Sequence, residues 1–280
     1  MRLARWSALA AIVALALAAC APTDDSSGSA PSATDGSLTT LKDGVLTVAT
    51  SDPAYGPWVV DNDPSSGKGF ESAVAYAVAE QLGFDKDHVT WVNDSFDQII
   101  APGAKDFDIA LNQVSISDER RASLDFSSPY YETAQAVVTL KGSKAQDATS
   151  LAALKPLRIG AMVGTTSLTS AQETIDPSTP VQVFNDNDQV KQALTSGLVD
   201  AIVVDLPTAL YITAAELDGG IVLGQLADSA GGDAFGIVLD KNSPLTPAVT
   251  TAVDALRSNG TLADLEATWL TDAAGAPVLQ

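Results

Sequence analysis

Short apolar runs alternate with helix-length amphipathic segments along most of this 280-residue chain. Residues 45–50 form a β-prone run. Residues 69–83 follow, with an apolar side chain at every fourth position from Phe70 to Leu82, which predicts an amphipathic helix. A second β-prone run covers residues 89–92. Strand, helix and strand in this order predict a parallel sheet with a right-handed crossover.

The same pattern begins again in the second half of the chain. Residues 157–161 are β-prone, residues 164–167 open a helix, and residues 181–184 form another β-prone run. A further helix ends at Gly197. Residues 198–204 are almost continuously apolar, which is typical of a parallel strand that is buried on both faces.

Two further β-prone runs, residues 136–140 and 234–239, lie where the chain would pass between these halves. We therefore expect an α/β fold with two lobes joined by two chain crossings. The two runs are the expected hinge segments. The first lobe should contain residues 42–135 and 240–280, and the second lobe residues 141–233.

The N-terminal residues read as an export signal. Two arginines precede an apolar run at residues 8–17, which is too short for a permanent membrane-spanning helix. Small residues then precede Cys20, so residues 1–20 are expected to be a lipoprotein signal peptide and Cys20 the lipidated (palmitate-bearing) residue. The chain has one cysteine and can form no internal disulfide, which supports lipid attachment at Cys20. The alternative is that Cys20 is a buried free cysteine. Residues 21–41, rich in small and polar side chains, are expected to form a flexible tether.

Charge and motif content exclude several classes of function. The chain has 35 acidic and 15 basic residues and a formal net charge of −20, which argues against a nucleic-acid partner. His88 is the one histidine, so neither a histidine metal cluster nor a serine triad can be assembled. No GxxxxGK phosphate loop occurs, and the turn at Asp61 lacks the glycine and glutamate of a calcium loop. We expect no metal and no cofactor.

One segment, residues 106–131, carries the most specific signal in the chain. It reads as a buried strand, a polar turn, a charged stretch with Arg120, and an apolar-aromatic return. The sequences SISDER and DFSSPYY resemble the signature of the extracytoplasmic solute-binding proteins, family 3, which serve ABC importers of polar amino acids. The resemblance implies a periplasmic-binding-protein-like fold (type II), a receptor without enzymatic activity, and permease and ATPase partners. It also implies a monomer that closes two lobes over its ligand.

The resemblance assigns the groups that would hold an amino acid's backbone. Arg120 would bind the carboxylate in bidentate geometry, with Ser115 and Gln113 beside it. Thr165 and Thr166 would meet the same carboxylate from the second lobe, and Asp205 would accept the ammonium group. Without the family resemblance, Arg120 could be a surface charge, Thr165 an ordinary helix cap, and Asp205 a helix N-cap. The cap and acceptor roles of Asp205 are compatible.

Selectivity is expected to come from side chains near the first strand. Asp52 and Tyr55 lie in a segment that resembles the family's first ligand loop, Phe96 would form an apolar wall, and Gln113 could add an amide contact. Trp58 reads as structural, and Tyr55 and Phe96 could equally be core residues. These side chains predict a polar or cationic ligand, namely glutamine, histidine, arginine or lysine.

Two other functions remain open on the same scaffold. An enzyme, such as a cyclohexadienyl amino-acid dehydratase, would need a general acid, for which Asp52 or Asp205 could serve. A sensor-type ligand-binding protein is the other alternative. The chain also departs from the family pattern at Ala73, where an acidic residue is usual, and at Pro102, which should break the preceding helix.

Overall fold

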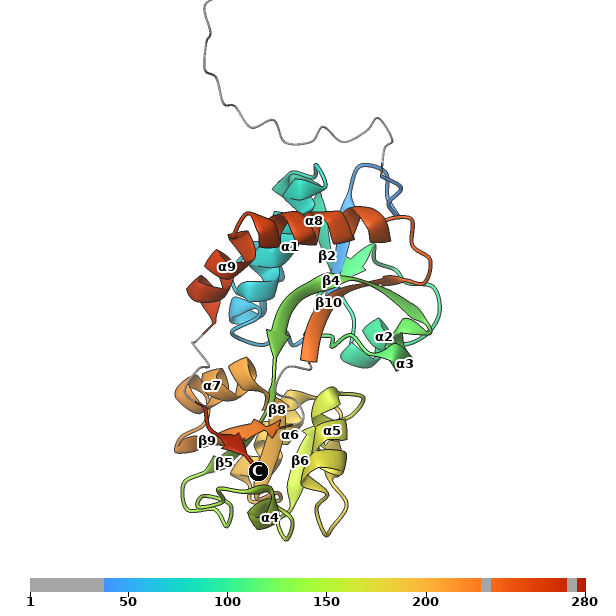
Figure 1. Cartoon of the computed structure of the whole chain (residues 1–280). Helices are drawn as coiled ribbons and strands as arrows, with labels where there is room; N and C mark the ends of the chain where they lie inside the picture. The colour runs from blue at the N-terminus through green and yellow to red at the C-terminus, as the bar shows by residue number, and fades with distance from the viewer. Residues whose placement is uncertain (1–37, 228–232, 271–275) are drawn as a thin grey trace, which may run out of the picture. The chain divides into compact units, whose positions relative to one another are not determined.

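The computed structural model describes residues 38–227, 233–270 and 276–280, which contain two mixed sheets with helices packed against them (Figure 1). The signal peptide, Cys20 and most of the expected tether lie outside these residues. Within the described part of the chain, no helix has the length and apolar character needed to cross a bilayer.

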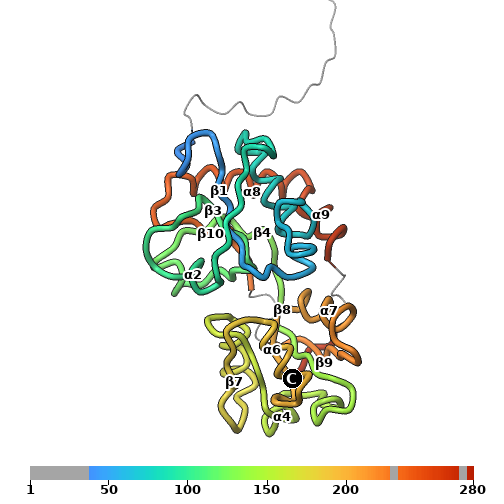
Figure 2. The backbone as a smooth tube through the Cα atoms, turned by 180° about the vertical axis from the view of Figure 1, so that it is seen from behind, coloured from blue at the N-terminus to red at the C-terminus, as the bar shows by residue number. Residues whose placement is uncertain are grey.

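The first sheet contains five strands in the order β2-β1-β3-β10-β4. β1 pairs in parallel with both β2 and β3, as the strand–helix–strand pattern predicted, whereas β10 pairs antiparallel with β3 and β4. The view from behind shows β1, β3 and β10 side by side (Figure 2). The strands are β1 (Leu46–Thr50), β2 (Val89–Asn93), β3 (Ile109–Ala110), β4 (Leu124–Thr133) and β10 (Asp233–Asp240).

Three helices contact one another and build the main core of the first lobe: α1 (Phe70–Gln81), α8 (Thr246–Ser258) and α9 (Thr261–Trp269). The apolar stripe predicted for α1 is buried in this core, with Phe70 and Val74 fully inaccessible. Two short helices, α2 (Phe96–Ile100) and α3 (Asp118–Arg121), complete the lobe. Single 3₁₀ turns occur at Val60–Asn62, Pro64–Ser66 and Lys86–His88.

The expected break near Pro102 is present. α2 ends at Ile100, and Ala101 is extended at φ −62° and ψ 147°, because the proline ring disfavours a helical conformation in the residue before it.

The second sheet contains six strands in the order β11-β9-β5-β8-β6-β7. β6 pairs in parallel with β7 and β8, while β5 pairs antiparallel with β8 and β9. The strands are β5 (Gln135–Leu140), β6 (Ile159–Met162), β7 (Gln182–Phe184), β8 (Ala201–Asp205), β9 (Gly220–Leu226) and β11 (Val278–Leu279).

Both faces of this sheet are covered, as the apolar run at residues 198–204 predicted. Val203 packs in one core cluster, whereas its neighbours Ile202 and Val204 pack in another, because successive side chains of a strand point to opposite faces. The covering helices are α4 (Leu151–Leu154), α5 (Thr166–Ser170), α6 (Asn187–Thr195) and α7 (Leu206–Ala215), with a π-helical turn at Ala171–Ile175.

The connections between the sheets differ from the expected hinges. Residues 136–140 lie inside β5 and residues 234–239 inside β10, so the chain passes between the sheets just before each run. Both runs are β-prone because they are paired strands. A third passage follows α9, since β11 pairs with β9 of the second sheet and not with the first, where residues 240–280 were expected.

The expected tether also ends earlier than residue 41. The backbone N–H of Leu41 donates to Asp108 Oδ1 at 2.7 Å, and Thr40 is buried, so these residues belong to the first lobe.

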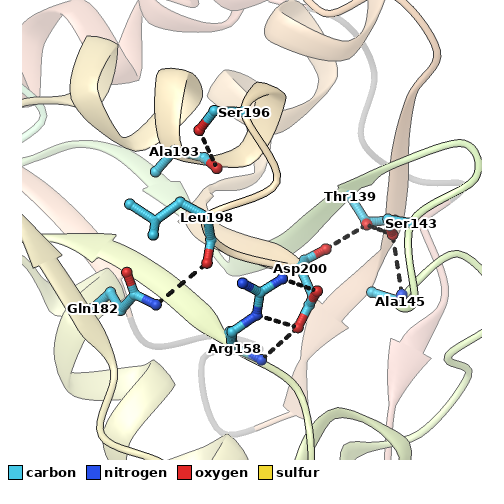
Figure 3. Close-up of polar contacts among 9 residues, drawn as sticks. All are labelled: Thr139, Ser143, Ala145, Arg158, Gln182, Ala193, Ser196, Leu198 and Asp200. Atoms are coloured by element: carbon cyan, nitrogen blue, oxygen red, sulfur yellow. Dashed lines mark hydrogen bonds and ion pairs between the residues drawn. The ribbon is translucent and has the colours of Figure 1, made fainter.

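An ion pair anchors the start of β6 beside β8. Arg158 donates from Nη2 to Asp200 Oδ1 at 2.6 Å and from Nε to Oδ2 at 3.0 Å, and its backbone N–H also bonds to Oδ2 (Figure 3). The hydroxyl of Thr139 in β5 donates to the backbone carbonyl of Asp200 at 2.7 Å. The hydrogen bonds from Arg158 hold the pKa of Asp200 below its usual range. These contacts join three neighbouring strands far from the pocket described next.

Candidate ligand-binding site

One pocket is lined by residues that follow strands of both sheets. All nine residues that the sequence pointed to line it, and they come together from segments up to 153 positions apart. They are Asp52, Tyr55, Phe96, Gln113, Ser115, Arg120, Thr165, Thr166 and Asp205.

The fold brings these residues together at strand ends. Asp52 follows β1, Gln113 follows β3, Thr165 follows β6, and Asp205 is the last residue of β8. In open α/β sheets, the carboxyl ends of the strands form the crevice in which ligands bind. The pocket therefore lies where the topology alone would place it.

Arg120 reaches residues of both lobes. Its Nη1 donates to the backbone carbonyl of Ser115 at 2.5 Å, and its Nη2 donates to the carbonyl of Gly164 at 2.9 Å. The guanidinium carbon lies 5.5 Å from the centre of the Phe96 ring. Burial lowers the pKa of Arg120, although Asp233 and Asp205 oppose this shift. The guanidinium of Arg120 is thus fixed in the pocket by hydrogen bonds and is not a solvated surface charge.

Asp205 occupies the N-cap position of α7 but does not cap it with its side chain. Its Oδ1 instead accepts a hydrogen bond from Gln135 Nε2 at 2.7 Å. Burial and the nearby Asp233 raise the pKa of Asp205 to about 7. A carboxylate that lines the pocket and does not cap its own helix is chemically suited to accept an ammonium group.

Hydroxyl groups from the two lobes meet beside Arg120. Ser115 Oγ and Thr166 Oγ1 lie 3.1 Å apart. Thr165 caps α5, because its hydroxyl accepts from the N–H of Leu168 at 3.1 Å, and it also donates to Met162 O at 2.8 Å. Thr165 therefore fills the plain capping role as well as lining the pocket.

Gln113 is held in place by a buried carboxylate that the sequence did not assign to the site. Gln113 adopts a left-handed backbone conformation at φ 48°. Its N–H donates to Glu71 Oε1 at 2.6 Å, its side-chain amide donates to Glu71 Oε2, and the Tyr130 hydroxyl also donates to Glu71. Burial raises the pKa of Glu71 to about 6. Glu71 thus fixes the loop that carries Gln113 and Ser115.

The expected selectivity residues differ in their surroundings. Asp52 is exposed and accepts from Asn62 Nδ2 at 2.9 Å, whereas Phe96 is buried. Lys191 Nζ lies 5.4 Å from the centre of the Tyr55 ring. Trp58 does not line the pocket: it is fully buried, and its Nε1 donates to Thr208 Oγ1 of α7 at 2.9 Å. Its structural assignment is confirmed.

Three polar residues close to the site carried no local signal in the sequence: Glu71, Gln135 and Asp233. Glu71 looks like an ordinary first-turn acid of α1, and Gln135 and Asp233 begin apolar strands. Their partners lie 31 to 98 positions away, so only the folded structure reveals them.

A pocket bounded by two α/β lobes, with a held guanidinium from one and a carboxylate from the other, defines a bilobed periplasmic-type binding protein. Residues 46–272 match the model of the bacterial extracellular solute-binding proteins, family 3, and the chain belongs to this family. The fold class and family expected from the sequence are confirmed.

Similar proteins with known ligands cover most of the chain. The L-arginine-binding protein of Pseudomonas aeruginosa is 30% identical over 214 residues, which is 74% of this chain and 81% of that protein. The L-cystine-binding protein TcyJ of Escherichia coli is 28% identical over 239 residues, 85% of this chain and 87% of that protein. The structure of an ancestral arginine-binding protein bound to arginine aligns with a TM-score of 0.68 at 29% identity, covering 81% of this chain and 98% of that one. The relatives are amino-acid-binding proteins, which supports a binding role.

Proposed function

We propose that this protein is an extracytoplasmic receptor that binds a polar or cationic L-amino acid between its lobes. It would deliver the ligand to a membrane permease whose partner ATPase powers import. The observation that carries this proposal is the pairing of Arg120 and Asp205 in one pocket. A free amino acid offers a carboxylate to the guanidinium and an ammonium group to the carboxylate, so one molecule satisfies both.

The charge balance of the pocket favours a ligand with a neutral or positive side chain. Its charged lining residues are Arg120, Asp52, Asp186 and Asp205. Asp186 already accepts two hydrogen bonds from Gln189 as the cap of α6. Once Arg120 and Asp205 hold the ligand's backbone groups, Asp52 remains to face the side chain. Arg121 contributes nothing there, because its guanidinium lies 5.9 Å from the centre of the Phe126 ring and does not line the pocket.

A thermal-shift screen against the common L-amino acids tests this proposal. Glutamine, histidine, arginine or lysine should raise the melting temperature well above aspartate or glutamate. The stabilisation grows with ligand concentration and reaches about 2.7 kcal/mol at a hundred times the dissociation constant. Stabilisation by glutamate and by none of these four would contradict the assignment of the pocket.

Asp52→Asn should weaken a cationic ligand by about tenfold and leave a neutral ligand almost unchanged, because the substitution removes charge and keeps the shape. Calorimetry with lysine and glutamine measures the difference. Asp61→Asn is the matched control, since Asp61 is an exposed carboxylate in the same region that does not line the pocket. Equal losses for lysine and glutamine would exclude a charge-selective role for Asp52.

We also propose that Cys20 carries a lipid that holds the mature protein at the membrane. The support is the sequence motif, because Cys20 lies outside the described residues. A Cys20→Ser variant expressed in a bacterium should lose labelling by a radioactive fatty acid and leave the membrane fraction. If label and membrane association both persist in the variant, the lipid is attached elsewhere or is absent.

A further inference from the structure

The side-chain amide of Gln135 joins two carboxylates next to the pocket. Its Nε2 donates to Asp205 Oδ1 at 2.7 Å and to Asp233 Oδ2 at 2.5 Å. Its Oε1 accepts from the Ser167 hydroxyl at 2.6 Å. Gln135 is fully buried, so these contacts are shielded from solvent.

The chemistry of the partners fixes the orientation of this amide. Ionised carboxylates only accept hydrogen bonds, whereas a serine hydroxyl can donate one. The opposite orientation would place the amide oxygen against both carboxylates and leave the amine facing the hydroxyl. Gln135 is therefore a donor to Asp205 and Asp233 together.

Strand register explains why these groups meet. Gln135 is directly opposite Asp205 where β5 pairs with β8 in the second sheet. Asp233 is opposite Thr133 where β10 pairs with β4 in the first sheet, and Thr133 lies two residues before Gln135 in the chain. The amide thus lies where the chain crosses from β4 of the first sheet to β5 of the second. Asp233 begins β10, directly after the chain has crossed back from β9 to the first sheet. One carboxylate comes from each sheet.

We propose that Gln135 is a positioning residue that keeps Asp205 ionised and aimed at the ligand's ammonium group, and that Asp233 opposes it from the other sheet. The inference rests on the proposed function. Asp233 is not among the residues that line the pocket described above, but it lies near Arg120 as well as Gln135. It would therefore act on affinity through Asp205, Gln135 and Arg120.

The charged and titratable groups around Asp205 determine the direction in which its pKa is shifted. Burial, Asp233 of β10 and Glu71 of α1 raise the pKa of Asp205, while the bond from Gln135 lowers it, and the resulting pKa is about 7. Asp205 also interacts with Arg120 of α3 and with Tyr130 and Tyr131 of β4. An ammonium ligand prefers the ionised carboxylate, so affinity should rise with pH through this region and fall about tenfold per pH unit below it.

Two variants should move this profile in opposite directions. Gln135→Met keeps the length of the side chain but removes the donor, so the midpoint should move to higher pH. Asp233→Asn removes the neighbouring negative charge with little change of shape, so the midpoint should move to lower pH. A residue that merely supported the fold would weaken binding equally at every pH.

Calorimetry from pH 5.5 to 8.0 tests these shifts with L-arginine, L-lysine or L-glutamine, whichever stabilises the wild-type protein most. The side-chain charge of all three is constant over this range. Gln192→Met is the matched control, because Gln192 is exposed on α6 and should leave the profile unchanged. Circular dichroism confirms that each variant is folded.

Opposite shifts of at least half a pH unit support the inference. Unchanged midpoints, or shifts in the same direction, overturn it while leaving the receptor function intact. Should Gln135→Met fail to fold, Asp233→Asn alone decides, since an unmoved or raised midpoint contradicts the assigned role. A wild-type protein that binds neither these three amino acids nor histidine overturns the proposed function, and this inference with it.

Discussion

Replacing Arg120 by alanine should weaken amino-acid binding by a hundredfold or more while the fold survives. The variant loses a charge-assisted pair of hydrogen bonds and leaves the ligand carboxylate without a partner in the pocket. Together these effects should cost about 3 kcal/mol. The contacts of Arg120 with the carbonyls of Ser115 and Gly164 are lost as well, and the second of these joins the two lobes. Calorimetry on the purified variant measures the loss.

Arg121→Ala is the matched control for this experiment. The two arginines are adjacent in α3 and carry the same charge, but Arg121 lies against Phe126, outside the pocket. Its removal should change affinity less than twofold. Equal affinities of wild type and Arg120→Ala would place the carboxylate clamp elsewhere in the protein.

Replacing Glu71 by alanine should destabilise the protein by about 3 kcal/mol and weaken binding at least tenfold. The hydroxyl of Tyr130 and the backbone N–H of Gln113 would lose their acceptor in a buried region. The left-handed turn at Gln113 would also lose its anchor, and with it the pocket would lose the fixed position of Ser115. Urea unfolding and calorimetry on the same samples measure the two effects.

The pH dependence of stability gives a second test of Glu71. Burial raises its pKa from the ordinary value of 4.5 to about 6, so between these values the folded protein holds a proton that the unfolded chain releases. The free energy of unfolding from this group therefore falls as pH rises through that window and is level above it. Glu71→Ala should have a shallower slope than the wild-type protein, with the remainder coming from Asp205, whose pKa is also raised. Glu80→Ala, at an exposed acid of the same helix, should retain the wild-type slope. An unchanged slope in Glu71→Ala would contradict the buried carboxylate.

The sequence predicts most elements of this fold because the signals are local. The spacing of apolar residues marks α1, and the continuous apolar run marks β8 as buried on both faces. The motif around Arg120 is readable from the sequence for the same reason, since its strand, turn and cation are consecutive in the chain. The hinge assignments at residues 136–140 and 234–239 failed because β-prone composition is identical in a linker and in a paired strand.

What the sequence could not supply depends on pairing over long distances. Gln135 meets Asp205 and Asp233 because four strands adopt one particular register, and no local pattern encodes that register. β11 contains two residues and has no periodicity to detect, yet its pairing with β9 moves the final described segment to the second lobe.

The position of β11 has a practical consequence for labelling. Leu38, the first described residue, packs against the core of the first lobe, whereas Val278 is paired within the second sheet. On the proposed closure of the two lobes over a ligand, fluorophores attached near these two residues would move relative to one another. Energy transfer between them would then report amino-acid concentration directly, without a fluorescent domain being inserted into the interior of the chain.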